Sequence, residues 1–126
     1  MPLVRIDLQT GTSAQYRATI GQVVYDSLIS IGVPKDDRFQ IITEKSPQEL
    51  LADRSYLGIE RTDAVVIIQI TLNEGRTTEV KKRLYQAIAS GLQEKVGLRP
   101  EDVFINLVEV KPENWSFGNG EAQYAK

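Results

Sequence analysis

The chain has 126 residues and a formal net charge of −2, and it contains neither histidine nor cysteine. It therefore has no imidazole or thiolate ligands for zinc and cannot build a Ser-His-Asp or Cys-His triad. The charge balance does not favour nucleic acid as a partner, and no apolar run is long enough to span a membrane. The N-terminus lacks the pattern of a signal peptide, so we expect a cytoplasmic protein with one domain over residues 1–126.

The first third of the chain has the pattern of a β-α-β unit. Residues 3–8 alternate in polarity, as a strand with one buried face does. Residues 13–31 carry apolar side chains at helical spacing, and Thr12 with Gln15 predicts a capping box at the start of this helix. A Gly-Val-Pro sequence ends the helix, and residues 39–43 are expected to form the next strand.

The same order of elements returns further along the chain. A strand is expected over residues 64–72, and its unbroken apolar run indicates burial on both faces. Residues 77–96 have the spacing of a helix, and a Gly-Leu-Arg-Pro sequence ends it. Residues 103–108 are expected to form the returning strand.

The two halves form an internal repeat, over about 1–45 and 63–110. Gly11 falls on Gly75, a shift of 64 that becomes 65 after the helix. Two tandem β-α-β repeats predict an α+β fold with a mixed sheet, right-handed crossovers and both helices on one face. The other face would be bare and partly apolar, so we infer an oligomer that covers it.

Two segments fall outside the repeats. Residues 46–61 link them, and a proline near the start of this linker predicts one helical turn over 46–51. The tail over residues 114–124 is rich in glycine and aromatic side chains. It is expected to form a turn or a short hairpin.

Three short motifs lie at the N-terminus, between strand and helix, and in the tail. Pro2 directly follows the initiator Met1. Residues 72–77 read Leu-Asn-Glu-Gly-Arg-Thr, similar to the Leu-Glu-Gly-Arg-Ser segment of 4-oxalocrotonate tautomerases. Residues 115–121 read Trp-Ser-Phe-Gly-Asn-Gly-Glu, similar to the aromatic-Phe-Gly-x-Gly tail of those enzymes. Together they make essentially the whole chain resemble the tautomerase superfamily. The resemblance implies the tautomerase (MIF-like) fold, a homotrimer with active sites near subunit contacts, and no cofactor or metal.

Two segments look closer to one branch of that superfamily, the malonate semialdehyde decarboxylase-like proteins. They are residues 33–40, Val-Pro-Lys-Asp-Asp-Arg-Phe-Gln, and residues 115–118. That branch uses the N-terminal proline, an aspartate at the place of Asp37, and two arginines in an Arg-Pro-Arg segment. Here Arg76 keeps the second arginine while Glu74 takes the place of the first, which counts against decarboxylation.

The expected catalytic group is Pro2, made N-terminal by removal of Met1. A free α-amine has a reference pKa of about 7.7–8.0. Burial and nearby positive charge lower the pKa of an amine, which leaves a neutral base available at pH 7. Arg76 is expected at a helix N-terminus, where its guanidinium would bind a substrate carboxylate in a bidentate way. The alternatives are a proline that only marks an edge strand and an ordinary solvated loop arginine.

Three further residues are candidates for the site. Asp37 is a candidate to orient a water molecule or polarise a carbonyl partner. Its counterpart in the second repeat, Asp102, favours the alternative that both aspartates only begin a strand. Trp115 and Phe117 are expected to wall a small apolar pocket and keep water from Pro2. They could equally pack an oligomer interface, where tryptophan is enriched.

These residues lead to three functional hypotheses. The first is a cofactor-independent keto–enol tautomerase, an isomerase of a small 2-oxo acid that uses Pro2 as acid and base. The second is a decarboxylase or hydratase of a 3-oxo acid such as malonate semialdehyde. The third is a trimeric module that binds small anions or proteins without catalysis, because a fold does not by itself establish a function.

Overall fold

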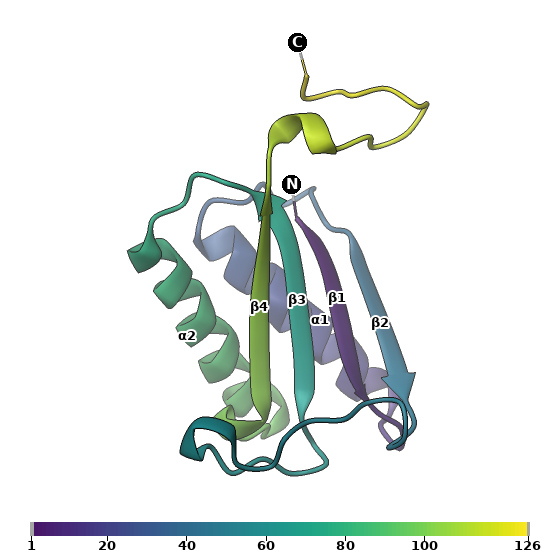
Figure 1. Ribbon diagram of the computed structural model, residues 1–126, viewed down its shortest axis with the longest axis vertical. Coiled ribbons are helices and arrows are strands. Elements are labelled where there is room, and N and C mark those ends of the chain that lie inside the picture. Colours follow the sequence, from purple (N-terminus) through teal and green to yellow (C-terminus); the bar gives the residue numbers. More distant parts are fainter. Residues whose placement is uncertain (1, 126) are drawn as a thin grey trace.

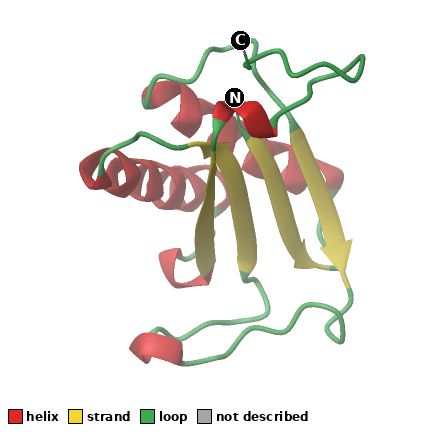
Figure 2. Ribbon diagram, turned by 45° about the horizontal axis from the view of Figure 1, so that its top comes forward, coloured by secondary structure: helices red, strands yellow, loops and turns green. Residues whose placement is uncertain are grey.

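The computed structural model describes residues 2–125 as a four-stranded mixed sheet with two helices on one face (Figures 1 and 2). The sheet order is β2-β1-β3-β4. Each helix connects two parallel neighbours, β1 to β2 and β3 to β4, while the central β1–β3 pair is antiparallel. The predicted α+β fold of two β-α-β units is thus confirmed. The elements are β1 (Leu3–Gln9), α1 (Ala14–Ser30), β2 (Gln40–Lys45), β3 (Val66–Asn73), α2 (Thr78–Val96) and β4 (Val103–Val110).

Short helical turns lie between and after these elements. They are the 3-10 helices η1 (Tyr56–Gly58), η2 (Pro100–Asp102) and η3 (Pro112–Asn114). The turn expected at the start of the linker is present, because the Leu50 N–H donates to the Ser46 carbonyl at 3.1 Å. Beyond η3 the described part of the tail contains turns but no strand, so the hairpin alternative is wrong.

The two long helices begin at equivalent capping residues. Ser13 caps α1 by accepting a hydrogen bond from the Tyr16 N–H at 3.0 Å, and Thr77 caps α2 through the Val80 N–H at 3.2 Å. The expectation that Thr12 caps α1 is wrong. Its hydroxyl donates to Glu44, on β2, at 2.6 Å. Ser13, not Thr12, directly precedes the first residue of α1 and so occupies the N-cap position.

The core lies between the helices and the inner face of the sheet. Fully buried side chains come from the sheet and from both helices. Burial of each such Ile or Leu stabilises the fold by about 1.5–3 kcal/mol. The helices approach closely where Gly91 faces Val23, since a Cβ on Gly91 would lie 2.7 Å from Val23 Cγ1. The fully buried residues at 0% exposure include Ile6, Ile20, Val24, Val66, Ile68, Ile70, Leu84, Ile88 and Leu92.

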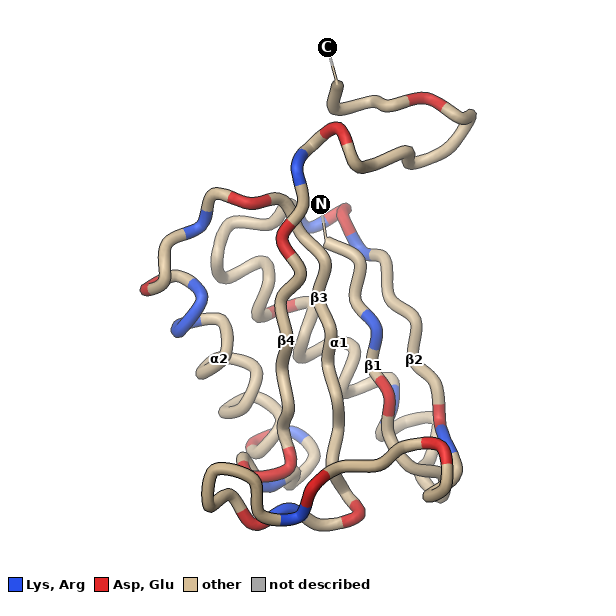
Figure 3. The backbone as a smooth tube through the Cα atoms, viewed as in Figure 1, with Lys and Arg blue, Asp and Glu red and all other residues tan. Residues whose placement is uncertain are grey.

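The outer face of the sheet is open in the single chain. The expected burial of β3 on both faces is not seen there, because Gln69 is exposed and Ile67 is only half-buried. Phe104 on edge strand β4 is 45% exposed, and Ile41 on the opposite edge strand β2 is 41% exposed. Figure 3 shows that β3 carries no charge along its length, whereas the neighbouring β1 carries Arg5 and Asp7. Among residues 2–125, no helix is long and apolar enough to cross a membrane.

The repeat extends to its ion pairs. Arg17 contacts Glu44 with 3.1 Å between Nη1 and Oε2, and the equivalent Lys81 contacts Glu109 with 2.9 Å between Nζ and Oε1. Each pair joins the first turns of a helix to the strand that follows it. Hydrogen bonds from the Thr12 hydroxyl and then from its backbone N–H lower the pKa of Glu44, and Arg17 lowers it further.

We expect Thr12→Val to raise the pKa of Glu44 toward its ordinary value, because the side-chain hydrogen bond is the largest cause of the shift. The folded-state pKa lies below the unfolded one. The contribution of Glu44 to stability is therefore present above the unfolded pKa and is lost as pH falls through the folded pKa. An NMR titration of the Glu44 carboxyl carbon in both proteins measures the shift, with Thr19→Val as control, since this half-buried threonine of α1 bonds to the Gln15 carbonyl. An ordinary pKa for Glu44 in the unsubstituted chain would contradict this reading.

Candidate active site

The strand register brings the sequence motifs to one end of the sheet. Val4 donates its N–H to the Phe39 carbonyl at 3.0 Å, and Leu3 lies opposite Thr71 of β3. Pro2, one residue earlier, therefore lies between the segment that precedes β2 and the last residues of β3. Figure 1 shows that the tail after β4 rises from this same end. Pro2 is buried, while Met1, whose removal we expect, lies outside the described residues.

Pro2 lines a pocket of about 220 Å³. Its walls are mainly apolar and come from the start of β1, the segment before β2, and the tail. Three of the predicted site residues meet here, namely Pro2, Trp115 and Phe117. The complete lining is Pro2, Leu3, Phe39, Trp115, Ser116 and Phe117.

The tail forms an aromatic wall beside Pro2. The rings of Trp115 and Phe117 are stacked, with centroids 5.4 Å apart and an interplanar angle of 17°. Tyr124 meets Phe117 edge to face, with centroids 4.9 Å apart. Offset stacks and edge contacts are favourable arrangements of aromatic pairs. Both Trp115 and Phe117 are half-buried, and both line the pocket beside Pro2.

Arg76 lies in the loop from β3 to α2, at the same end of the sheet but outside the pocket lining. Its Nη1 donates to the Asn73 carbonyl at 3.2 Å, and its side chain is half-buried. Thr77 next to it caps α2. A guanidinium beside a helix N-terminus combines a full charge with unpaired backbone N–H groups, an arrangement that favours a carboxylate or phosphate. Glu74 of the same loop is exposed.

Asp37 also lies at this end and outside the pocket lining. It is 7% exposed and sits two residues before Phe39, with its N–H donating to the Pro34 carbonyl at 3.2 Å. Its counterpart Asp102 is fully buried and accepts hydrogen bonds from the Thr62 N–H and hydroxyl, both at 2.7 Å. The second aspartate thus has a structural role in tying the linker to the start of β4.

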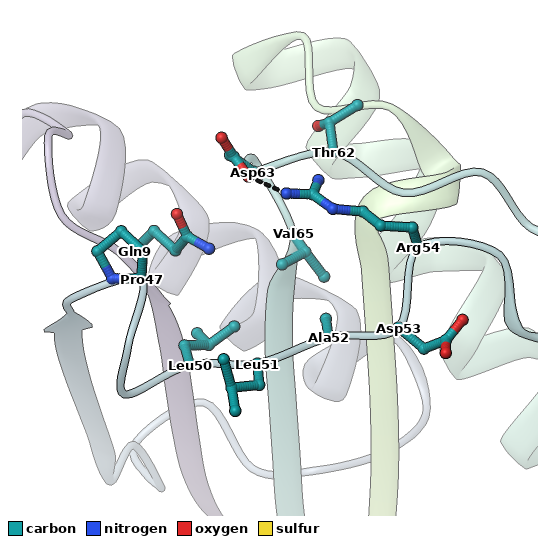
Figure 4. Close-up of a pocket in the computed structure, with 10 residues that line it drawn as sticks. All are labelled: Gln9, Pro47, Leu50, Leu51, Ala52, Asp53, Arg54, Thr62, Asp63 and Val65. Carbon is teal, nitrogen blue, oxygen red and sulfur yellow. Dashed lines mark hydrogen bonds and ion pairs between the residues drawn. The ribbon is translucent and has the colours of Figure 1, made fainter.

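A larger cavity of about 480 Å³ lies at the other end of the sheet, between the linker and the end of β1 (Figure 4). Gln9, Leu50 and Val65 are part of its lining. Its one arginine, Arg54, pairs with Asp63, as the dashed line in Figure 4 shows. Because this arginine already pairs with a carboxylate of the wall, the cavity is less suited to an anionic ligand than the Pro2 end. Among residues 2–125 there is no group of three acidic side chains that could hold a metal ion.

Sequence reasoning missed four residues of this end. Leu3, Phe39 and Ser116 line the pocket, and Asn73 accepts a hydrogen bond from Trp115 Nε1 at 2.8 Å. Leu3 adjoins Pro2, and Ser116 stands in the motif over residues 115–121 between the two aromatic residues that were singled out. Asn73 stands in the motif over residues 72–77, but its partner is 42 residues away in the sequence.

Comparisons with known proteins agree with this fold. The family model described as "Tautomerase enzyme" matches residues 37–118. The "Probable tautomerase YusQ" of Bacillus subtilis (strain 168) is 45% identical over 124 residues, which are 98% of each chain. A structure of FG41 malonate semialdehyde decarboxylase inhibited by 3-bromopropiolate has a TM-score of 0.90 and 41% identity, covering 97% of this chain and 93% of that one.

Two further structures extend the likeness. A malonate semialdehyde decarboxylase, described with decarboxylase and hydratase activities, has a TM-score of 0.89 and 29% identity, covering 97% of this chain and 95% of that one. A fused 4-OT wild type symmetric trimer shares the fold, with a TM-score of 0.77 at 20% identity, covering 94% of each chain. The chain belongs to the tautomerase family. Within that family its relatives support an enzyme, similar both to probable tautomerases and to malonate semialdehyde decarboxylases.

Proposed function

We propose that the protein is a keto–enol tautomerase of a small 2-oxo acid, with Pro2 as its acid and base. The observation that carries the proposal is the burial of Pro2 in an apolar pocket walled by Trp115 and Phe117. A pocket of about 220 Å³ suits a small substrate. Arg76, at the same end of the sheet, supplies the positive charge that a substrate carboxylate needs.

The reaction needs one group that accepts and returns a proton. After removal of Met1, the Pro2 nitrogen is a secondary amine with a lone pair. It takes the proton from the hydroxyl of the enol, the carbonyl forms at C2, and the electrons of the carbon–carbon double bond accept the same proton at C3. Arg76 holds the carboxylate and stabilises negative charge that develops on the enolate. Trp115 and Phe117 keep the site dry, which strengthens these electrostatic interactions.

The proposal includes a homotrimer. Its support is the partly apolar outer face of the sheet, together with the trimeric state of the fused 4-OT that shares the fold. Burial of that face between copies removes apolar surface from water. Sedimentation at assay concentrations should give about three times the chain mass of 14.1 kDa, and a stable single chain would contradict the trimer.

The direct test is ketonisation of a simple enolpyruvate by the untagged protein, followed by the loss of enol absorbance. The intact mass must first establish that Met1 is absent. Turnover that saturates with substrate and exceeds the solution rate supports the proposal. A mature protein that leaves the solution rate unchanged for both an alkyl and an aryl enolpyruvate would contradict it.

A second candidate function is decarboxylation or hydration of a 3-oxo acid such as malonate semialdehyde. Two observations favour it: Asp37 is buried at the Pro2 end, and the relatives include malonate semialdehyde decarboxylases. In this case protonated Pro2 acts as an acid and Asp37 helps to activate water. Carbon dioxide release from malonate semialdehyde, measured beside the enolpyruvate assay, separates the two functions.

A further inference from the structure

Asn73, the last residue of β3, contacts two parts of the candidate site at once. Its side-chain Oδ1 accepts a hydrogen bond from Trp115 Nε1 at 2.8 Å. Its backbone carbonyl accepts one from Arg76 Nη1 at 3.2 Å. The two donors come from the tail and from the loop before α2. One residue therefore ties the aromatic wall and the guanidinium to the same end of the sheet.

The tail otherwise closes on itself. Phe117 donates its N–H to Gln123 Oε1 at 2.9 Å, and Gln123 Nε2 donates to the Gly118 carbonyl at 2.9 Å. Within the described part of the chain, the other hydrogen bonds of residues 114–125 also stay in the tail or reach Lys111. The bond between Asn73 and Trp115 is thus the polar link, among the described residues, from the aromatic wall to the sheet.

This link belongs to one repeat only. With the shifts of the repeat, Gln9 takes the place of Asn73 and Leu50 takes the place of Trp115. Leu50 is buried and has no polar hydrogen to donate. The end of the sheet that lacks Pro2 therefore also lacks the link, although the backbone there follows the same path into a turn.

We propose that Asn73 is a positioning residue, which acts through Trp115 to fix the aromatic wall at the distance from Pro2 that a substrate requires. The inference rests on the proposed function for its kinetic consequence. An amide suits this role because it accepts the indole hydrogen bond without adding a negative charge that would compete with the substrate for Arg76. Arg76 bonds to the backbone carbonyl, so a change of the Asn73 side chain leaves that acceptor in place.

The test is a double-mutant cycle with Asn73→Leu, which removes the acceptor, and Trp115→Phe, which removes the donor but keeps a ring. We expect each change to raise KM about 3–10-fold, as for loss of one hydrogen bond, with a smaller effect on kcat. The double variant should be no worse than either single one, because both remove the same bond. Gln93→Leu, an exposed amide on α2, is the matched control and should change neither constant.

The single tryptophan of the chain gives a readout that needs no substrate. In Asn73→Leu the emission of Trp115 should shift to longer wavelength, because the released ring becomes more exposed to water. If the unsubstituted protein has no tautomerase turnover but this shift occurs, the proposed function fails while the positioning role stands. If Asn73→Leu does not fold, Asn73→Ala takes its place in the cycle, because Trp115→Phe also changes a ring that lines the pocket. Unchanged emission, an unchanged KM, or additive effects in the double variant would each overturn the inference.

Discussion

Pro2→Ala is expected to lower the turnover of an enolpyruvate by about 10²–10⁴-fold, the share that a positioned acid and base contributes. The substitution keeps a small residue at the start of β1, where Pro2 is buried against the aromatic wall. It replaces a conformationally fixed secondary amine with a mobile primary amine. The loss should therefore fall on kcat, with the fold and the free energy of unfolding nearly unchanged. Steady-state kinetics and urea unfolding of both proteins measure the two quantities.

A matched pair of proteins isolates the nitrogen itself. One carries an N-terminal extension, so that the Pro2 nitrogen is an amide. In the other, proteolysis of the same extension leaves Pro2 as the first residue. Only the second should turn over substrate, since an amide nitrogen has no basic lone pair. Equal activity before and after cleavage would exclude Pro2 as the base, whatever Pro2→Ala had shown.

Arg76→Ala is expected to reduce kcat/KM for a 2-oxo acid by about 10–100-fold, the range for loss of a hydrogen-bonded partner of a charged group. Most of the loss should appear in KM, because the guanidinium binds the carboxylate of the substrate before and after proton transfer. Arg76→Lys should recover part of the loss, since an ammonium keeps the charge but not the bidentate geometry. The readout is the same enolpyruvate assay.

Arg83→Ala provides the control for this change. Arg83 is an exposed arginine of α2, so its substitution also removes one positive charge without touching the site end of the sheet. If both variants weaken binding by the same small factor, the effect is long-range electrostatics. An unchanged KM in Arg76→Ala would leave Arg76 as an ordinary loop arginine that donates to Asn73.

The order and type of the main elements follow from the sequence because each is encoded locally. Helical spacing in α1 and α2, and the turn sequences that end them, are properties of neighbouring residues. The details that differ depend on contacts far along the chain. Thr12 lies one residue before the N-cap of α1, and its hydroxyl bonds to Glu44 on β2, 32 residues away. Residue 64 lies outside β3, since the preceding Thr62 is bound to Asp102 instead of continuing a strand.

The site was predictable to the extent that its residues stand in short motifs. Pro2, Trp115 and Phe117 meet in one pocket, and this follows from the order of strands. A residue's position in a motif does not show whether its side chain lines the pocket. Arg76 and Asp37 lie at the same end of the sheet but outside the pocket lining. Position in a motif also could not reveal Phe39 as a wall, because a phenylalanine at the start of a strand reads as ordinary core. The roles of these residues remain predictions for the kinetics above.

The chain repeats its secondary structure, its helix caps and its ion pairs, but its N-terminal nitrogen cannot be repeated. The residue equivalent to Pro2 in the second half is Val66, whose nitrogen is a peptide amide in the middle of the polypeptide. Because the two β-α-β units are joined in one chain, there is one basic terminal nitrogen for every two units. Under the proposed mechanism, the second end of the sheet therefore meets no requirement imposed by proton transfer. Its aspartate can bind a linker threonine, and its cavity can hold an internal ion pair.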